Sequence, residues 1–562
     1  MHVTDKFPML NGKHTDPRTK RYLTPTRIVK TFGRVTGAEN LFGEHYPQVA
    51  MRVGGVCRME NKPGEEHAAI LLDFGIEFSG SLRLFPHSST VRGESVGSDI
   101  RVRLGESVGE ALTHVGEKGA CNDHANRDFL MNIPFWSGNE TNESGFRFAY
   151  IELLSEEGVL EFQKILGVFT YRDLEYKGSF ESSDELLNRI WNVSAYTVHL
   201  CMQEYMWDGI KRDRLVWIGD MHPELMTTLA VFGDCDVIER SLDLVRAETP
   251  AGEWMNHLST YSLWWVMIHA DLYRSAGNIE YLREQREKLV DILSRALAFV
   301  DENGSEIMPE KRFLDWPNEA NEGAKHAGIQ AMLKMTLEKG AVILREIEEN
   351  ELAERCEGTA ERMKMHIPDP CGSKQAAALL ALSGLGDAKK LNDEVISVGG
   401  AKKFSTFFSY YILAAKAMAG DSAGALETLR EYYGAMLKMG ATTFWEDFDI
   451  EWMENSAPID EIVLEGMKDI HGDFGAYCYK NYRHSLCHGW ASGPCPYLAH
   501  YVLGIRPIDA TTYEIKPDLA DLEWAKGTYP TVKGIIAVEV RKTPDGLNVE
   551  YTAPDGIKVV TK

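Results

Sequence analysis

The pattern of hydrophobic and polar positions changes its period twice along the chain. From about residue 24 to residue 176, short apolar alternations such as AILLDFGIEFSGSLRLF and FRFAYIELL are separated by Gly, Ser and Asn. This period of two predicts an N-terminal β-sandwich. The alternation returns after Gly504, most clearly in IIAVEV, and predicts a second, small β-sandwich there.

Between these β regions the apolar positions recur at helical spacing. Ser182 and Glu185 form a capping box before the first predicted helix, and further helices are predicted at 223–247, 260–275, 279–303, 323–347, 374–384, 403–418, 421–438 and 490–503. The connecting loops differ in length, which disfavours a regular solenoid. About a dozen antiparallel helices would suffice for a toroid of paired helices. We therefore predict three domains, over residues 1–177, 178–504 and 505–562.

Composition and charge narrow the classes of partner. The chain has 44% hydrophobic and 26% charged residues, as globular proteins do. Its 60 Lys and Arg against 84 Asp and Glu give a net charge of -24, which argues against nucleic acid or an anionic membrane as a partner. The sequence has no N-terminal apolar segment and no run of about 18 apolar residues. We expect a cytoplasmic protein, although a secreted or periplasmic protein trimmed of its signal peptide would have the same pattern.

The cysteines suggest neither a disulfide framework nor a zinc site. There are nine, an odd number, and none belongs to a CxxC pair. In the N-terminal β region, Glu77, Glu106 and the cluster Asn122, Asp123 and His124 could be ligands. Isolated polar residues between strands are more often solvated turns, so we do not assign these residues to a site.

One polar stretch, WDGIKRDRLVWIGDMHPE at residues 207–224, combines opposite charges with tryptophans. It contains Asp208, Asp213, Asp220, Lys211, Arg212, Arg214, Trp207 and Trp217. Pro223 favours the first turn of a helix, which predicts that the charged residues form the loop before that helix. A self-paired surface loop would explain the charges alone. The two interleaved indoles favour a pocket for a polar ligand with an apolar face, such as a sugar.

Four further loops of the helical region carry similar residues. They are FLDWPNE with Asp315 and Trp316, GATTFWEDFDIEW with Trp445 and Glu446, SLCHGWASGP with His488 and Trp490, and EWMNHLSTYSLWW with Trp254, His257, Trp264 and Trp265. Each has a structural explanation of its own: at least one of Trp264 and Trp265 is expected in the core, and His488 could cap a helix. A helical toroid carries its inter-helix loops at one end, so the loops together predict one site.

Paired carboxyl groups in such a site are typical of glycosidic bond cleavage. One carboxyl must carry a proton for the leaving oxygen, and the other must be ionised to act as a base or nucleophile. Asp213 has both carboxylates and arginines as neighbours in the sequence, and these shift a carboxyl pKa in opposite directions. The sequence alone leaves its protonation open.

The same residues carry a family resemblance. Asp208, Arg212, Asp213, Trp217 and Asp220, followed by Asp315 with Trp316, Trp445 with Glu446, and His488 with Trp490, resemble the α-L-rhamnosidases of glycoside hydrolase family 78, in the six-hairpin glycosidase superfamily. The DFG and RLGES segments at 73–75 and 103–107 and the C-terminal β region extend the resemblance over most of the chain.

The resemblance implies a multidomain fold, with a central (α/α)6 barrel between two β-sandwiches, and inverting hydrolysis of terminal α-L-rhamnosyl residues. Asp213 would be the general acid and Glu446 the general base, with carboxyl groups about 6.5–9.5 Å apart. The residues assigned to sugar binding are Asp208, Arg212, Trp217, Asp220, Trp265, Asp315, Trp316, Trp445 and His488. We expect a small-molecule or oligosaccharide rhamnoside as substrate, no metal or other cofactor, and a homodimer as one possible assembly.

One departure from the family pattern bears on the acid. Many members have Glu at this position, often in an RDE sequence, whereas here Arg212 is followed by Asp213 and Arg214. Asp is shorter by one methylene, which reduces its reach by about 1.5 Å. Two alternatives therefore stay open: a related glycosidase with another sugar specificity, and a non-catalytic sugar-binding protein.

Overall fold

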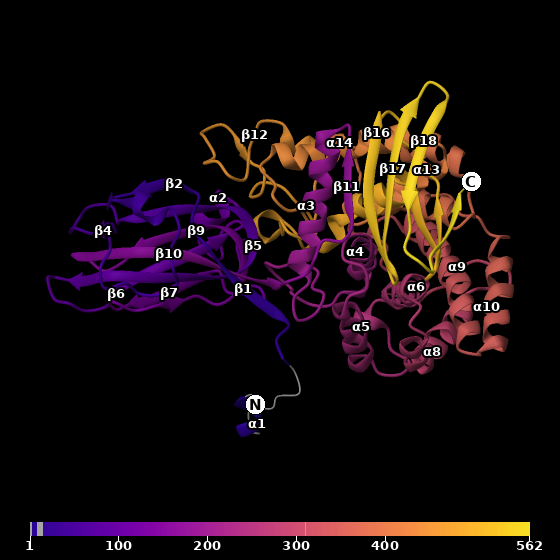
Figure 1. The fold of residues 1–562 in the computed structure, drawn as a ribbon, viewed down its shortest axis with the longest axis horizontal. Helices are drawn as coiled ribbons and strands as arrows, with labels where there is room; N and C mark the ends of the chain where they lie inside the picture. Colours follow the sequence, from indigo (N-terminus) through magenta and orange to yellow (C-terminus); the bar gives the residue numbers. More distant parts are fainter. Residues whose placement is uncertain (1–2, 8–14, 310, 562) are drawn as a thin grey trace.

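The computed structural model describes residues 3–7, 15–309 and 311–561. A β region at the N-terminal end lies beside a helical block, and small C-terminal sheets pack against the helices (Figure 1). Among the described residues, no helix is long and apolar enough to cross a membrane. All nine cysteines are free thiols.

The N-terminal β region is one continuous antiparallel sheet of ten strands. In chain order these are β1 (Arg18–Leu23), β2 (Arg27–Phe32), β3 (Arg34–Thr36), β4 (Cys57–Glu60), β5 (Ala69–Val91), β6 (Ser98–Gly105), β7 (Asp128–Ile133), β8 (Asn139–Glu140), β9 (Ser144–Leu153) and β10 (Gly158–Arg172). The strand order is β3-β4-β10-β5-β9-β6-β7, with β1 on β10 and with β2 and β8 on β5. The 23-residue β5 pairs with different neighbours along its length, so the strands of the predicted sandwich form one hydrogen-bonded sheet. A short helix, α2 (Val108–Leu112), follows β6.

The helical block contains the predicted ring of helices. Its helices are α3 (Glu185–Cys201), α4 (Ile218–Val231), α5 (Asp236–Glu248), α6 (Ser259–Ala276), α7 (Ile279–Glu284), α8 (Arg286–Leu297), α9 (Glu322–Glu346), α10 (Asn350–Met363), α11 (Lys374–Leu382), α12 (Ala388–Leu391), α13 (Ser409–Met418), α14 (Ser422–Lys438) and α15 (Pro494–Tyr497). Contacts run from α4 to α6, α9, α11, α13, α15 and back to α4. These six helices close an inner ring, and α3, α5, α8, α10, α12 and α14 are interleaved with them in the sequence.

Three helix predictions near the site need correction. The helix predicted to start near Pro223 begins at Ile218, with Pro223 inside it. The predicted helix 223–247 is two helices, because the chain turns after α4 at Gly233, where φ is +83°. The first helix is capped by Asp184 rather than Ser182: its Oδ1 accepts the N–H groups of Leu186 and Leu187 at 2.9 and 3.3 Å.

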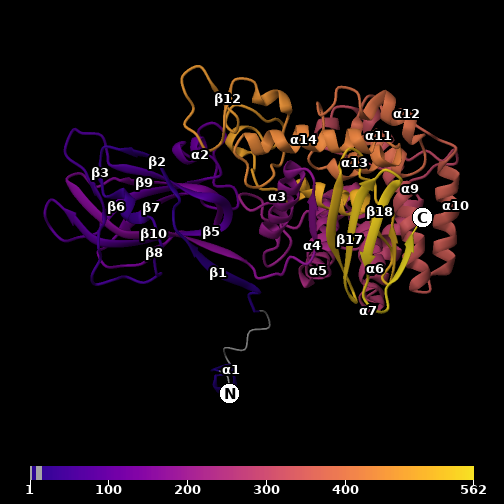
Figure 2. The same ribbon diagram turned by 45° about the horizontal axis from the view of Figure 1, so that its top comes forward.

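The C-terminal strands form two small sheets. They are β14 (Ile505–Asp509), β15 (Thr512–Ile515), β16 (Trp524–Thr531), β17 (Gly534–Thr543), β18 (Gly546–Thr552) and β19 (Lys558–Thr561). One sheet has the order β14-β15-β19; the other has the order β11-β16-β17-β18, where β11 (Ser179–Ser182) precedes the first helix of the block. Ile536, Val538 and Val540 of β17 belong to the same buried cluster as the helices. The C-terminal sheets therefore share the core of the helical block, and they lie against its helices in both views (Figures 1 and 2).

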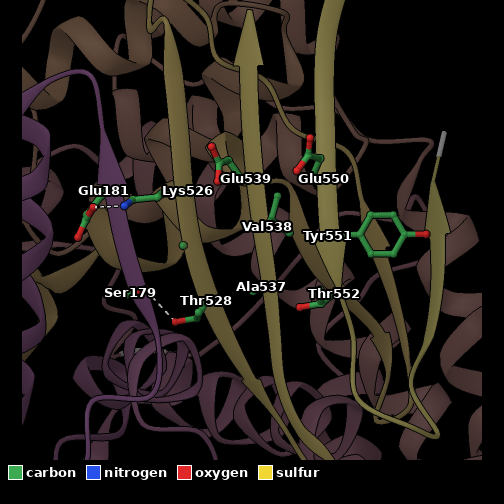
Figure 3. Close-up of a pocket in the computed structure, with 11 residues that line it drawn as sticks. Ser179, Glu181, Lys526, Thr528, Ala537, Val538, Glu539, Glu550, Tyr551 and Thr552 are labelled. Atoms are coloured by element: carbon green, nitrogen blue, oxygen red, sulfur yellow. Dashed lines mark hydrogen bonds and ion pairs between the residues drawn. The ribbon is translucent and has the colours of Figure 1, made fainter.

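The four-stranded sheet bears an open groove of about 500 Å³. Figure 3 shows Lys526 in its ion pair with Glu181, at 2.8 Å, and Glu539 beside Glu550 on neighbouring strands. None of the residues predicted for the sugar site lies in this groove.

A long irregular segment, residues 440–490, lies between the N-terminal sheet and the helices in both views, around the short strand β12 (Ser456–Ala457) (Figures 1 and 2). The N-terminal sheet region holds it through direct hydrogen bonds. The Val108 N–H donates to the Ile459 carbonyl at 2.8 Å, and Arg147 donates to the Gly440 carbonyl at 3.0 Å. The N-terminal region thus positions the segment that carries Glu446 and His488.

Candidate active site

The loops at one end of the helical ring enclose a cavity of about 290 Å³. Its lining consists of Asp208, Arg212, Asp213, Trp217, Asp220, Asn256, Leu258, Tyr261, Phe313, Trp316, Glu446, Cys478, His488 and Trp490. Eight of the eleven residues predicted from the sequence are among them: Asp208, Arg212, Asp213, Trp217, Asp220, Trp316, Glu446 and His488. The volume is near the lower end of the range of ligand pockets, about 300–1,000 Å³.

Arg212 joins the two carboxyl groups predicted to catalyse the reaction. Its Nη1 donates to Asp213 Oδ1 at 3.0 Å, and its Nη2 donates to Glu446 Oε1. Its Nε donates to the Arg483 carbonyl at 2.9 Å, which fixes the plane of the guanidinium. Burial opposes the charge on Arg212, but Glu446 and Asp213 together raise its pKa above the ordinary value. One permanently charged group therefore sets the positions of both carboxyls.

Glu446 is buried and held as a carboxylate. Its Oε2 accepts the Ser485 N–H at 3.1 Å, and its backbone carbonyl accepts the Trp490 indole N–H at 2.8 Å. Burial alone would raise its pKa, but the cation of Arg212 and the nearby His488 lower the pKa below the ordinary value. An ionised carboxylate is what a general base requires.

Asp208, Asp220 and His488 form the polar floor of the cavity. His488 Nε2 lies 3.0 Å from Asp220 Oδ1, and the Asp208 carboxylate accepts the Leu215 N–H at 3.0 Å. Burial lowers the pKa of a histidine, but Glu446 and Asp220 raise that of His488 above its ordinary value. Burial in turn raises the pKa of Asp208 and Asp220, although His488 opposes both shifts. Acceptors and a donor thus face the same small space.

Asp213 lies on a strained piece of backbone. Asp213 and Arg214 both have positive φ, +54° and +57°, which non-glycine residues rarely adopt. The turn is held on one side by Arg214, which stacks on Trp207 at 4.4 Å and donates to the Glu143 carbonyl at 3.0 Å. On the other side Trp217 Nε1 donates to Asp213 Oδ2 at 3.3 Å. Such strain is characteristic of functional sites.

The start of α4 explains how Asp220 reaches the cavity. The Ile218 N–H donates to the Asn256 side chain at 3.0 Å, and the Asn256 amide donates back to the Val216 carbonyl at 3.0 Å. This cap from a distant loop starts the helix five residues before Pro223 and places Asp220 in its first turn.

Several lining residues were not predicted from the sequence. Tyr261 donates to Asp220 at 3.4 Å, and its ring meets Trp217 edge to face at 6.1 Å. Leu258, Phe313 and Cys478 also line the cavity. Tyr261 follows the apolar pattern of α6, and Leu258, Phe313 and Cys478 are apolar residues outside the helices. No sequence signal therefore separated these residues from the core.

Three predicted residues lie outside the lining. Trp445 is fully buried behind Glu446 and meets Phe448 edge to face at 5.5 Å. Asp315 caps the turn that carries Trp316, accepting its N–H at 2.9 Å, and burial raises the Asp315 pKa to about 6. Trp265 is buried in α6 with its ring 3.9 Å from that of His269.

Behind the cavity, Lys211 joins the N-terminal region to the site. Its Nζ lies 3.0 Å from Glu106 and 3.3 Å from Glu110, and it donates to the Tyr482 carbonyl at 2.9 Å. Glu106, Glu110 and His471 bring possible ligand atoms within 4.8 Å of one another, but the Lys211 ammonium group already contacts both carboxylates. Glu106 also accepts the Leu486 N–H at 2.7 Å, two residues before His488. Burial raises the Glu106 pKa to about 7, with Lys211 opposing the shift.

Comparison with known proteins agrees with this geometry. Residues 175–374 match the family described as the bacterial alpha-L-rhamnosidase 6 hairpin glycosidase domain. This chain carries a six-hairpin α-L-rhamnosidase domain. The matched residues of the rhamnosidase domain include Asp208, Asp213 and Trp316; Glu446 and His488 lie beyond them.

Solved structures share the fold of the helical block and of the sheets on either side of it. A glycoside hydrolase family 78 rhamnosidase of Bacillus sp. GL1 has a TM-score of 0.74 at 21% identity, over 91% of this chain and 55% of that chain. A rhamnosidase from Klebsiella oxytoca with rhamnose bound has a TM-score of 0.66 at 20% identity, over 86% of this chain and 95% of that chain. An alpha-L-rhamnosidase of Formosa agariphila is 29% identical over 104 residues, which make up 18% of this chain and 11% of that protein. This chain thus spans about half of the Bacillus chain and nearly all of the Klebsiella chain.

Proposed function

We propose that this protein hydrolyses terminal α-L-rhamnosyl residues with inversion of the anomeric configuration. The observation that carries the proposal is Arg212, which binds Asp213 and Glu446 at once beside a cavity in an α-L-rhamnosidase domain. The rhamnose named in the Klebsiella structure supports the choice of sugar.

Glu446 acts as the general base in this proposal. A water molecule between Glu446 and the anomeric carbon gives up a proton to the carboxylate and attacks the carbon on the face opposite the leaving group. Arg212 keeps Glu446 ionised despite its burial. Asp213, on the other side of Arg212, gives its proton to the departing glycosidic oxygen.

The remaining lining residues bind one sugar ring. Asp208, Asp220 and His488 offer hydrogen-bond acceptors and a donor to the hydroxyl groups. Trp217 and Trp316 form an apolar wall that suits the methyl group of a 6-deoxy sugar and the apolar face of its ring.

The test is hydrolysis of p-nitrophenyl α-L-rhamnoside, with the anomer of the released sugar followed by proton NMR. Wild-type protein should release the inverted anomer first. Glu446→Gln keeps the size of the side chain but removes the base, so kcat should fall by about 10²–10⁴-fold with little change in KM. Asp213→Asn should lower kcat less for this activated substrate than for a methyl rhamnoside, because the methoxide leaving group needs the proton.

The alternatives predict other results. Turnover of a different p-nitrophenyl glycoside, with none of the rhamnoside, would assign another sugar to the same pair of carboxyls. Calorimetric binding of free rhamnose without turnover of any substrate would indicate a sugar-binding protein. Release of the retained anomer would contradict the role of Glu446 as a base acting on water.

A further inference from the structure

A loop of the N-terminal region reaches the proposed acid. Residues 121–127 form the last part of the connection from α2 to β7, and α2 lies at the edge of the sheet that faces the helices (Figures 1 and 2). At the tip of this loop, His124 Nδ1 lies 3.4 Å from Asp213 Oδ1. The His124 side chain is 50% exposed, whereas that of Asp213 is 18% exposed.

The loop is held in this place from several sides. Asp123 forms an ion pair with Arg483 at 2.8 Å, and the Arg483 carbonyl is the acceptor for Arg212 Nε. The Arg127 N–H closes the loop on the Asn122 side chain at 3.0 Å. His124 itself has a φ of +56°, a conformation that a non-glycine residue adopts at a cost. The ion pair and the hydrogen bond of this loop therefore hold His124 next to Asp213.

His124 differs chemically from the other partners of Asp213. Arg212 and Trp217, the two side chains that donate to its carboxylate, are donors only and cannot take up a proton from it. An imidazole can both give and accept a proton near neutral pH. Among the described contacts of Asp213, His124 alone connects the carboxyl to solvent through a group that exchanges protons.

We propose that His124 returns a proton to Asp213 after each turnover. This inference rests on the proposed hydrolysis by Asp213 and Glu446, and makes His124 a positioning residue that acts through Asp213. His124 belongs to the N-terminal region and lies outside the cavity lining, so it acts on the acid and not on the sugar.

During hydrolysis the Asp213 proton goes to the glycosidic oxygen, the carbon–oxygen bond breaks, and a proton of the attacking water goes to Glu446. Asp213 is then one proton short, and Glu446 has one in excess. The Nδ1–H of the His124 imidazolium transfers to Asp213 Oδ1, His124 takes a proton from solvent, and Glu446 releases one to solvent.

The charges around His124 suit this role. Arg212 and Arg483 lie on the side of the helical block, Asp123 precedes His124 in the loop, and Asp213 faces its ring. Asp123 is already paired with Arg483, so Asp213 is the carboxylate with which His124 exchanges a proton.

Two variants and two substrates test the proposal. His124→Ala removes the imidazole, and His124→Gln keeps an amide that can donate a hydrogen bond but cannot titrate. With methyl α-L-rhamnoside, whose leaving group needs a proton, kcat should fall about 10–100-fold in both variants, less than the loss of the acid itself. With p-nitrophenyl α-L-rhamnoside, kcat should stay within about twofold of wild type, because this leaving group needs little protonation. Added imidazole should restore turnover of the methyl rhamnoside by His124→Ala.

His114→Gln is the matched control, since His114 is an exposed histidine of the same sheet region that pairs with Arg101. It should leave both substrates unaffected. Equal losses of kcat on both substrates would indicate that the loop has only a structural role and would overturn the relay. The same conclusion would follow if His124→Gln, without added imidazole, turned over the methyl rhamnoside as fast as wild-type protein. Unchanged turnover in both His124 variants would overturn it as well. If wild-type protein cleaves neither rhamnoside, the proposed function itself fails, and the relay with it.

Discussion

At the scale of single residues, one arginine controls the chemistry of the site. Arg212 contacts Asp213 and Glu446 through different nitrogens of one planar group. Glu446 is buried, and burial without a partner would protonate it. The cation thereby decides the pH range in which the proposed base works.

Exchanging Arg212 should move the acid limb of the pH–rate profile. The pKa of Glu446 is lowered in the folded protein, so its base form persists as pH falls through the ordinary carboxyl range. In Arg212→Met, burial acts without the cation, and the acid limb of kcat/KM should shift to higher pH. Arg212→Lys keeps a positive charge and should shift the limb less. Superimposable acid limbs for wild type and Arg212→Met would contradict this account.

At the scale of secondary structure elements, the first turn of α4 is the critical piece. Gly219 permits the close approach of Tyr261: a Cβ at this position would lie 2.5 Å from the tyrosine ring. Tyr261 in turn contacts Asp220 and Trp217. A residue with no side chain therefore shapes the cavity wall.

Gly219→Ala should impair the site although alanine favours helices. The added methyl group displaces Tyr261, so KM for p-nitrophenyl α-L-rhamnoside should rise about tenfold, an effect of about 1.4 kcal/mol on binding. Gly358→Ala is the matched control, because Gly358 lies exposed in α10 with nothing within 4 Å of a Cβ. That change should leave KM unchanged and stabilise the protein by up to about 1 kcal/mol. A normal KM in Gly219→Ala would mean that Tyr261 yields without harm.

The sequence predicted the order of the elements and most of the polar site, for physical reasons. Periodicity reports which face of an element is buried, so the β region, the helices and the C-terminal strands could be recognised. Asp208, Arg212, Asp213 and Glu446 could be recognised by a second signal, charged residues next to tryptophans in loops. The start of α4 could not be predicted, since its cap is Asn256 of another loop.

The sequence does not distinguish tryptophans that line the cavity from tryptophans of the buried core. Trp265 and Trp445 look like Trp217 and Trp316 in the sequence, yet both are completely buried. The domain boundaries at 177 and 504 remain predictions. The pairing of β11 with β16 shows how chain segments on either side of the helices combine in one sheet.

At the scale of the whole molecule, buried charges tie the N-terminal sheet to the helical block. Lys211 reaches Glu106 and Glu110 across this junction, and all three side chains are buried. Removing one partner of such a group leaves the others uncompensated in a medium of low polarity.

Lys211→Met should destabilise the protein by about 3–5 kcal/mol, since the buried Glu106 loses its cation and Glu110 keeps only Arg127, at 3.6 Å. Urea unfolding measures the change. Combining Lys211→Met with Glu106→Gln removes the uncompensated charge and should recover part of the loss, as a double-mutant cycle would reveal. Glu110 is kept, because it also pairs with the buried Arg127 at 3.6 Å. Additive losses would show that Lys211 and Glu106 act independently. Lys389→Met is a suitable control, because Lys389 is exposed in an i,i+4 pair with Asp393.

The same junction has a consequence for how the protein is made. During synthesis the N-terminal sheet emerges first and can collapse around its own core, with Glu106 and Glu110 in place. Ser485 and Leu486, which bind Glu106, follow about 380 positions later, as the separations of 379 and 380 indicate. At about 5–20 residues per second, the nascent sheet would wait on the order of 20–80 s for them. For that time its docking face is open to chaperones and to other chains, so a ribosome-bound fragment ending before residue 440 should bind chaperones and show no hydrolysis.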